Sequence, residues 1–104
     1  MNKCWFDYKT VILSGASSGI GKGIAERLII DHGCKVIGIA RNEERLLNFK
    51  KELGDKGDNF TYYTFDVSQE EKWYELADTL RKENIRPDML INNAGILPKF
   101  DKFV

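Results

Sequence analysis

The stretch SGASSGIG, from Ser14 to Gly21, decides how this chain folds. It follows the β-branched run Thr10-Val11-Ile12-Leu13, which is typical of a buried strand, and it precedes apolar residues at helical spacing. Gly15 permits a sharp turn off the strand, Gly19 lets the backbone approach a phosphate group, and Gly21 lets helix and sheet pack closely. The helix N-terminus adds free N–H groups and the positive end of its dipole. The stretch therefore predicts a phosphate cradle between a strand and a helix.

Strand-like runs and helix-like segments alternate through the rest of the sequence. Runs of β-branched, aromatic or other apolar residues predict further strands at 35–40, 60–65 and 88–92. Between the strands, mostly apolar residues recur at helical spacing and should form the buried faces of three helices. These residues are Ile20, Ile24, Leu28 and Ile29, then Leu46, Phe49, Lys50 and Leu53, then Trp73, Leu76, Ala77 and Leu80.

Local signals predict where the helices begin and end. Gly33 sits where a helix C-cap belongs, and Asn42 is a good N-cap for the second helix. Residues 54–59 have turn composition. The run Ser68-Gln69-Glu70-Glu71 has the pattern of a capping box, which predicts that the third helix opens at Ser68.

The alternation of strands and helices predicts an α/β fold in which right-handed crossovers connect parallel strands. We expect one domain over residues 1–104, a three-layer Rossmann-type parallel sheet with strand order 3-2-1-4. A complete doubly wound nucleotide fold has the order 3-2-1-4-5-6, so this sheet is expected to be truncated after strand 4. Strand 4 then becomes an edge, and we expect copies to associate through that edge or through the apolar tail Ile96-Leu97-Pro98-Lys99-Phe100.

Charge and hydropathy argue against several classes of partner. Lys plus Arg (16) equals Asp plus Glu (16), so the formal net charge is zero. This balance gives no electrostatic reason to expect nucleic acid or an anionic membrane, and it favours self-association. No run approaches the roughly 18 apolar residues that a membrane span needs. The segment Met1–Asp7 lacks the apolar core of a signal peptide, so a cytoplasmic location is expected.

The cysteines and the single histidine predict no special chemistry. In a cytoplasmic protein, Cys4 and Cys34 should be reduced thiols rather than a disulfide. The spacing of these cysteines and His32 matches no metal-ligand pattern, so no metal is expected. We expect ordinary buried cysteines and a surface histidine.

The glycine spacing separates this loop from two related ones. The loop does not end in Gly-Lys-Ser/Thr, which excludes a P-loop. In the usual dinucleotide fingerprint, the two glycines that are nearest in sequence come first, whereas in this loop they come last. The order Gly15-x3-Gly19-x-Gly21 instead resembles the Thr-Gly-x3-Gly-x-Gly loop of the short-chain dehydrogenase/reductase family. Ser14 replaces the usual Thr and keeps its hydroxyl.

Three further motifs at family spacing extend the resemblance over the whole chain. Arg41-Asn42 follows strand 2, where family members choose their cofactor. Asp66-Val67 follows strand 3, where the family's Asp accepts a bond from the adenine amino group. Asn92-Asn93-Ala94-Gly95 closes strand 4, where the family's motif stabilises the sheet and lines the adenosine pocket. The residues that the loop and the resemblance assign to the cofactor are Gly15, Ser17, Ser18, Gly19, Ile20, Gly21, Arg41, Asn42, Asp66, Val67, Asn92, Asn93, Ala94 and Gly95.

The end of strand 2 predicts NADP rather than NAD. NAD selection needs a carboxylate there for the ribose 2′-hydroxyl, but this strand ends on Ala40. The next residue, Arg41, has a guanidinium that can make two charge-assisted hydrogen bonds to a 2′-phosphate, and Ser17 or Ser18 could add a hydroxyl donor. Two alternatives remain open, in which Arg41 is a solvated surface residue and Asp66 simply caps the following helix.

The resemblance also shows what the sequence does not contain. The family's hydride chemistry uses a Tyr with a Lys four residues later, and that spacing follows none of Tyr8, Tyr62, Tyr63 and Tyr74. We therefore assign no catalytic residue and expect no turnover by this chain alone. Three explanations stay open: a fragment, a half-length module that binds nucleotide without turnover, or a chain that works with a second one. The intact parent would be an NADPH-dependent carbonyl reductase or alcohol dehydrogenase.

Overall fold

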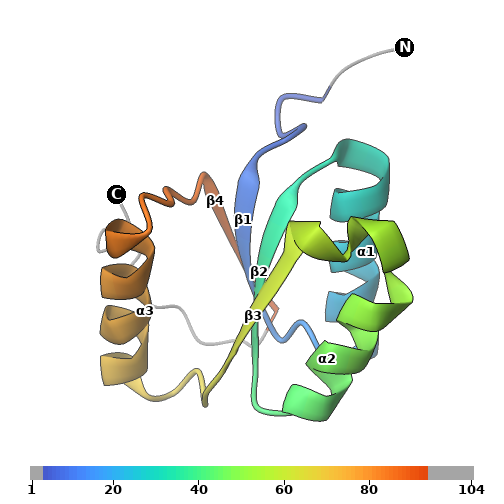
Figure 1. The fold of residues 1–104 in the computed structure, drawn as a ribbon. Coiled ribbons are helices and arrows are strands. Elements are labelled where there is room, and N and C mark those ends of the chain that lie inside the picture. Colours follow the sequence, from blue (N-terminus) through green and yellow to red (C-terminus); the bar gives the residue numbers. More distant parts are fainter. Residues whose placement is uncertain (1–3, 94–104) are drawn as a thin grey trace.

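The computed structural model of the chain describes residues 4–93 and leaves 1–3 and 94–104 undescribed (Figure 1). Strands and helices alternate in it as the sequence predicts. The elements are β1 (Thr10–Ser14), α1 (Gly19–His32), β2 (Lys35–Ala40), α2 (Glu43–Glu52), the 3-10 helix η1 (Gly54–Asn59), β3 (Phe60–Thr64), α3 (Glu70–Lys82) and β4 (Met89–Asn92).

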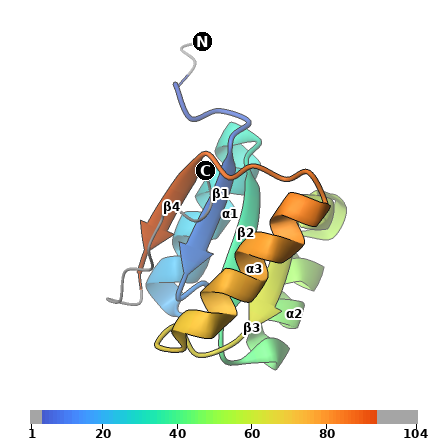
Figure 2. The ribbon, with the colours of Figure 1, turned by 90° about the vertical axis from the view of Figure 1, so that its left-hand side faces the viewer.

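The four strands form one sheet in the order β3-β2-β1-β4, and all neighbours are parallel. Helices α1 and α2 cover one face of the sheet and α3 covers the other (Figures 1 and 2). The predicted three-layer Rossmann-type fold with strand order 3-2-1-4 is therefore confirmed. Because the strands are parallel, their carboxyl ends share one edge of the sheet, and that edge carries the glycine loop.

The core has two parts, one on each face of the sheet. Successive strand residues point to opposite faces, so Val11 and Leu13 face α1 and α2 while Ile12 faces α3. The α3 side is closed by the four helix residues that the sequence identified, Trp73, Leu76, Ala77 and Leu80, all buried. Burial on both faces explains why these strands read as continuous apolar runs rather than as alternating ones.

Helix α1 corrects one expectation. Its buried residues are Gly21, Ala25, Leu28 and Ile29, whereas Ile20 is 73% exposed. Ser18 caps the helix, and Gly21 occupies the sheet-facing position of the first turn, which turns Ile20 outward. The predicted C-cap is confirmed, because Gly33 has a φ of 65° and its N–H contacts the Ile29 carbonyl.

Helix α2 follows the prediction at its start and departs from it at one inward position. The Asn42 side chain accepts the Arg45 N–H at 3.1 Å, so the expected N-cap is confirmed. Lys50, placed on the buried stripe, is half-buried because its ammonium donates to the carbonyls of Gly57 and Phe60. The turn predicted at 54–59 is a short 3-10 helix.

The predicted capping box at Ser68 is wrong. Helix α3 begins at Glu70, and its N-cap Gln69 makes no side-chain capping bond. The reason is competition, because the Asp66 carboxylate accepts both the Ser68 N–H (2.9 Å) and the Ser68 hydroxyl (2.8 Å). Strand β4 also starts one residue later than predicted. Asp88 instead makes two hydrogen bonds with Thr10. The Asp88 N–H donates to the Thr10 carbonyl, and the Asp88 carboxylate accepts the Thr10 N–H.

Candidate functional site

The loop between β1 and α1 is a tight turn whose glycines have different reasons to be there. Gly15 has a φ of +72°, which only glycine adopts without strain. A Cβ on Gly21 would lie 2.0 Å from the Gly15 carbonyl oxygen, so packing within the loop forbids any side chain there. A Cβ on Gly19 would meet no described atom within 4 Å. The chain's own packing therefore explains glycine at 15 and 21 but not at 19.

Ser18 holds the loop in shape. Its hydroxyl donates to the Gly15 carbonyl (2.9 Å) and accepts the Gly21 N–H (3.1 Å). It also accepts the amide N–H of Asn93 at 3.0 Å. A hydroxyl has one hydrogen to donate and two lone pairs, so these three bonds use it fully. Of the two serines that the sequence offered as hydroxyl donors to a ligand, Ser17 is therefore the better candidate.

Side chains at the end of strand β4, distant in the sequence, hold the loop through hydrogen bonds. The Ser14 hydroxyl donates to the Asn92 side-chain oxygen at 2.7 Å. Asn93 donates through Nδ2 to the Gly15 carbonyl (3.3 Å) as well as to Ser18. The structure thus brings the predicted asparagine pair and the predicted glycine loop together. Ala94 and Gly95, the other half of the asparagine motif, lie outside the described residues.

This contact predicts that Asn93→Ala loosens the loop. The change removes two hydrogen bonds, each worth about 1 kcal/mol, so we expect the free energy of unfolding to fall by about 2 kcal/mol. Urea denaturation followed by circular dichroism measures it. Asn48→Ala, an exposed asparagine on α2, is the control and should stay within about 0.5 kcal/mol of the wild type. An equal loss in both variants would contradict the role given to Asn93.

The ends of β2 and β3 bring Arg41 and Asp66 near one another. The Arg41 guanidinium is 79% exposed and lies 3.8 Å from the Asp66 carboxylate, a loose pair that solvent screens. Hydrogen bonds from Ser68, with the charge of Arg41 adding to them, hold the pKa of Asp66 below its usual value. Asp66 is therefore an ionised acceptor at neutral pH. Its alternative role as a helix cap is excluded, because Gln69 holds that position.

The remaining predicted residues at these strand ends have structural contacts. Asn42 caps α2, as described above. The Val67 carbonyl accepts the Trp73 indole N–H at 2.9 Å, and the Val67 side chain packs against the core under α3. Ile20, the exposed residue of the first helical turn, lies next to Gly19 at the mouth of the loop.

Two basic residues near the loop were missed from the sequence. A groove between α1 and α2 is lined by Ser17, Lys22 and Arg45 among others. The Lys22 ammonium is paired with the Glu52 carboxylate at 2.7 Å, so its charge is partly neutralised. Nothing in the sequence places Arg45 beside the loop, because that contact depends on how α2 packs against α1.

The cysteines and histidine differ in part from the expectation. Both cysteines are free thiols, as predicted. Cys34 is buried, and burial raises the pKa of its thiol. Cys4, however, is exposed, and His32 is half-buried against Asp7, with 2.8 Å between the ring Nδ1 and the carboxylate. No pattern of residue types indicates this contact, because it joins residues 25 positions apart.

Across residues 4–93, every helix is too short or too polar to pass through a bilayer.

The fold and its glycine loop define a Rossmann-type α/β chain, and comparison with known proteins places it more narrowly. Residues 9–103 match the family model described as short chain dehydrogenase. The chain belongs to the short-chain dehydrogenase/reductase family.

Named relatives and solved structures agree with this placement. A diacetyl reductase ((S)-acetoin forming) of Staphylococcus epidermidis is 41% identical over 85% of this chain and 34% of its own length. An NADPH-dependent pterin aldehyde reductase of Arabidopsis thaliana is 35% identical over 90% of this chain and 38% of its own. The structure of L-sorbose reductase from Gluconobacter frateurii, complexed with NADPH and L-sorbose, matches with a TM-score of 0.73 at 30% identity, covering 86% of this chain and 34% of that one. The chain thus spans about a third of the length of the relatives it matches.

Proposed function

We propose that this chain binds NADP(H) through the adenosine and pyrophosphate half of the cofactor. The observation that carries the proposal is the glycine loop, where Gly19 exposes bare backbone that no packing requirement explains. A pyrophosphate lying against that backbone and the first turn of α1 would explain it. Families of this kind bind nicotinamide dinucleotides, and NADPH is bound in the related sorbose reductase structure.

The preference for NADP over NAD rests on the end of β2. Ala40 closes the strand without a carboxylate that would repel a 2′-phosphate. Arg41 follows it with an exposed guanidinium, and its ion pair with Asp66 is loose, at 3.8 Å, so a phosphate could replace that partner. Ser17 is the hydroxyl that we assign to the same phosphate, because the Ser18 hydroxyl is occupied within the loop.

The remaining assigned residues receive the adenosine. We propose that the Asp66 carboxylate accepts the adenine amino group and that Val67 lines the ring pocket beside it. Asn42, Asn92 and Asn93 hold the surrounding backbone in place. Ala94 and Gly95, which the resemblance assigns to the same pocket, lie outside the described residues. Ile20 contributes its backbone N–H to the phosphate.

We further propose that the whole protein transfers a hydride between NADPH and a carbonyl or alcohol substrate in the cytoplasm. The reductase names of the relatives support this reaction class. The residues of this chain bind and orient the cofactor, and none of its tyrosines has the Tyr-x3-Lys spacing. Binding and turnover are therefore separable: NADPH fluorescence tests the first, and a panel of carbonyl substrates tests the second. We expect weak binding and no turnover; binding absent at millimolar NADPH would contradict the proposal.

Self-association is a second property that we propose for the chain. Within residues 4–93, β4 has a strand neighbour on one side, β1, and its four residues are half-buried. Backbone groups along an open strand edge favour pairing with another chain, and zero net charge does not oppose it. The other predicted contact, the tail 96–100, lies outside the described residues. We expect light scattering to show a mass that rises with concentration, whereas a constant monomer mass would contradict this expectation.

A further inference from the structure

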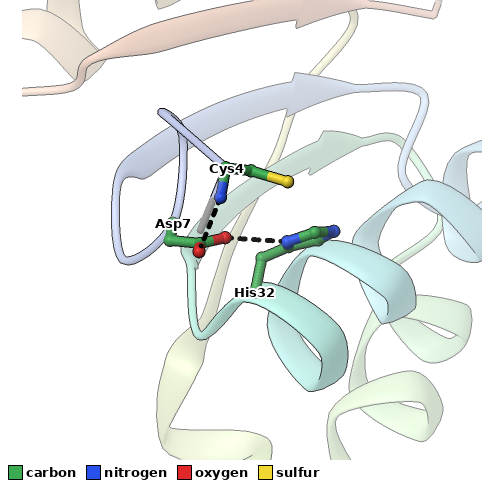
Figure 3. A group of neighbouring side chains, drawn as sticks. All are labelled: Cys4, Asp7 and His32. Atoms are coloured by element: carbon green, nitrogen blue, oxygen red, sulfur yellow. Dashed lines mark hydrogen bonds and ion pairs between the residues drawn. The ribbon is translucent and has the colours of Figure 1, made fainter. Parts of the chain in front are cut away.

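Three metal-ligating side chains meet at the end of the sheet opposite to the glycine loop. Cys4 and Asp7 lie on the turn that precedes β1, and His32 is the last residue of α1. One ligand atom from each, the thiol sulfur, a carboxylate oxygen and a ring nitrogen, all lie within 4.8 Å of one another. Figure 3 shows the three side chains gathered between the turn and the helix end.

The turn that carries two of the three groups is already formed. The Asp7 N–H donates to the Cys4 carbonyl at 3.0 Å, and the Cys4 N–H donates to the Asp7 carboxylate at 3.0 Å. Cys4 and Asp7 are therefore held at a spacing of three residues, the spacing of paired ligands in C-x2-C zinc sites. Both lie on one side of the turn, toward His32 (Figure 3).

The histidine ring is fixed by its surroundings. Phe6 packs edge-on against it with 4.6 Å between ring centroids. The Tyr8 N–H donates to the His32 carbonyl at 2.9 Å, which joins the turn to the end of the helix. The ring Nδ1 already lies 2.8 Å from the Asp7 carboxylate, with the His32 and Asp7 side chains 26% and 17% exposed. Because the Asp7 and His32 side chains are already ordered, a ligand that binds them loses little free energy in fixing their conformations.

Charge at this place suits a cation. A thiolate and a carboxylate together balance a divalent ion, and the C-terminal end of α1 adds the negative end of the helix dipole. The nearby Arg27 is paired with Asp31 at 3.1 Å, which lessens its repulsion. Sulfur, imidazole and carboxylate together are the ligand set of zinc rather than of calcium or magnesium.

We propose that Cys4, Asp7 and His32 form a zinc site that clamps the N-terminal turn to the end of α1, with water as the fourth ligand. Ligand atoms around tetrahedral zinc lie roughly 3.5 Å apart. The Asp7 carboxylate oxygen and the His32 Nδ1 lie 2.8 Å apart and must separate slightly, while the Cys4 sulfur must approach both. Cys4 is exposed, and rotation of its side chain is unhindered by the core. On binding, the thiol releases its proton to water, and the ring keeps its proton on Nε2 rather than on Nδ1, so that the metal replaces the hydrogen bond between Nδ1 and the Asp7 carboxylate.

The test uses the untagged chain, reduced with a phosphine and stripped of metal with a chelator. We expect one zinc per chain by competition with a chromophoric chelator, and a raised melting temperature when zinc is present. Cys4→Ser and His32→Gln should each weaken zinc binding at least about 10-fold. Glu44→Gln, which removes an exposed carboxylate in the first turn of α2 and away from the site, is the matched control and should bind as the wild type does.

Cobalt substitution gives a readout that depends on the sulfur alone. The wild-type chain with Co²⁺ should show a thiolate-to-metal absorption band that Cys4→Ser abolishes. Because Cys4 is exposed, this variant should keep its fold, which circular dichroism checks. Absence of stoichiometric zinc binding, or a Cys4→Ser variant that binds zinc and cobalt unchanged, would overturn the proposal.

Discussion

Replacing Gly21 by alanine should destabilise the chain strongly, whereas the same change at Gly19 should leave its stability intact. The added Cβ at residue 21 would lie 2.0 Å from the Gly15 carbonyl oxygen, and no rotamer change relieves a clash with backbone. Overpacking of this kind costs about 3 kcal/mol, which lowers the melting temperature of a domain of this size by roughly 10 to 20 °C. At residue 19 the Cβ meets no described atom within 4 Å.

The two glycine variants separate folding from binding. Gly19 begins α1, where alanine is at least as favourable as glycine for the helix. The methyl group would instead stand where the pyrophosphate approaches, so we expect NADPH affinity to fall at least about 10-fold in a fully folded protein. Thermal denaturation and NADPH fluorescence, measured on both variants, give the comparison. If Gly19→Ala bound NADPH as the wild type does, the exposed backbone of the loop would not be the phosphate site.

Arg41→Ala should remove most of the discrimination between NADPH and NADH. Charge-assisted bonds from a guanidinium to a phosphate are worth about 1.5 to 3 kcal/mol, or roughly 10- to 150-fold in dissociation constant. NADH lacks the 2′-phosphate, so its binding should be unchanged. Arg41→Lys should fall between the two, because it keeps the charge but loses the fork.

The control for this series is Arg27→Ala, which removes another exposed arginine from α1. It should leave both dissociation constants as they are, apart from a small uniform effect of net charge. Equal affinity of the wild type for NADPH and NADH, or no change in Arg41→Ala, would show instead that Arg41 is a solvated surface arginine. That was the alternative left open by the sequence.

Where local chemistry decides the structure, the sequence was sufficient. The glycine spacing predicted the turn at Gly15, and Asn42 and Gly33 form the caps that their residue types favour. The strand order could be predicted because successive parallel strands need right-handed crossovers, which leave few arrangements for four strands. The adjacency of the loop and the Asn92-Asn93 pair then follows, because β1 and β4 are neighbours in that order.

Where two local signals compete, or where a contact joins distant segments, the sequence was not sufficient. Ser68 begins a capping-box pattern, but its hydroxyl and N–H donate to the Asp66 carboxylate instead of capping the helix. The helix therefore begins at Glu70. Ile20 fits a helical stripe, yet the phase of α1 is set by the close packing of Gly21 against Gly15. Neither competition is visible from residue types and spacing alone.

The contact of Asp7 with His32 joins segments that are distant in the sequence. It depends on how the turn before β1 packs against the end of α1, and a single histidine in a sequence carries no signal for it. The groove beside the loop that Lys22 and Arg45 line likewise arises from the packing of two helices. Both features lie on the surface, where apolar periodicity gives no guidance.

Two-dimensional NMR of the isotope-labelled chain can map the backbone amides that respond to NADP⁺. This measurement detects weak binding and locates it. We predict the largest shifts at the amides of residues 15–21, with further shifts at Arg41 and Asp66, and much smaller loop shifts in Gly19→Ala. Shifts that are absent at millimolar NADP⁺, or that cluster away from the loop, would contradict the central claim that this turn binds the phosphates of the cofactor.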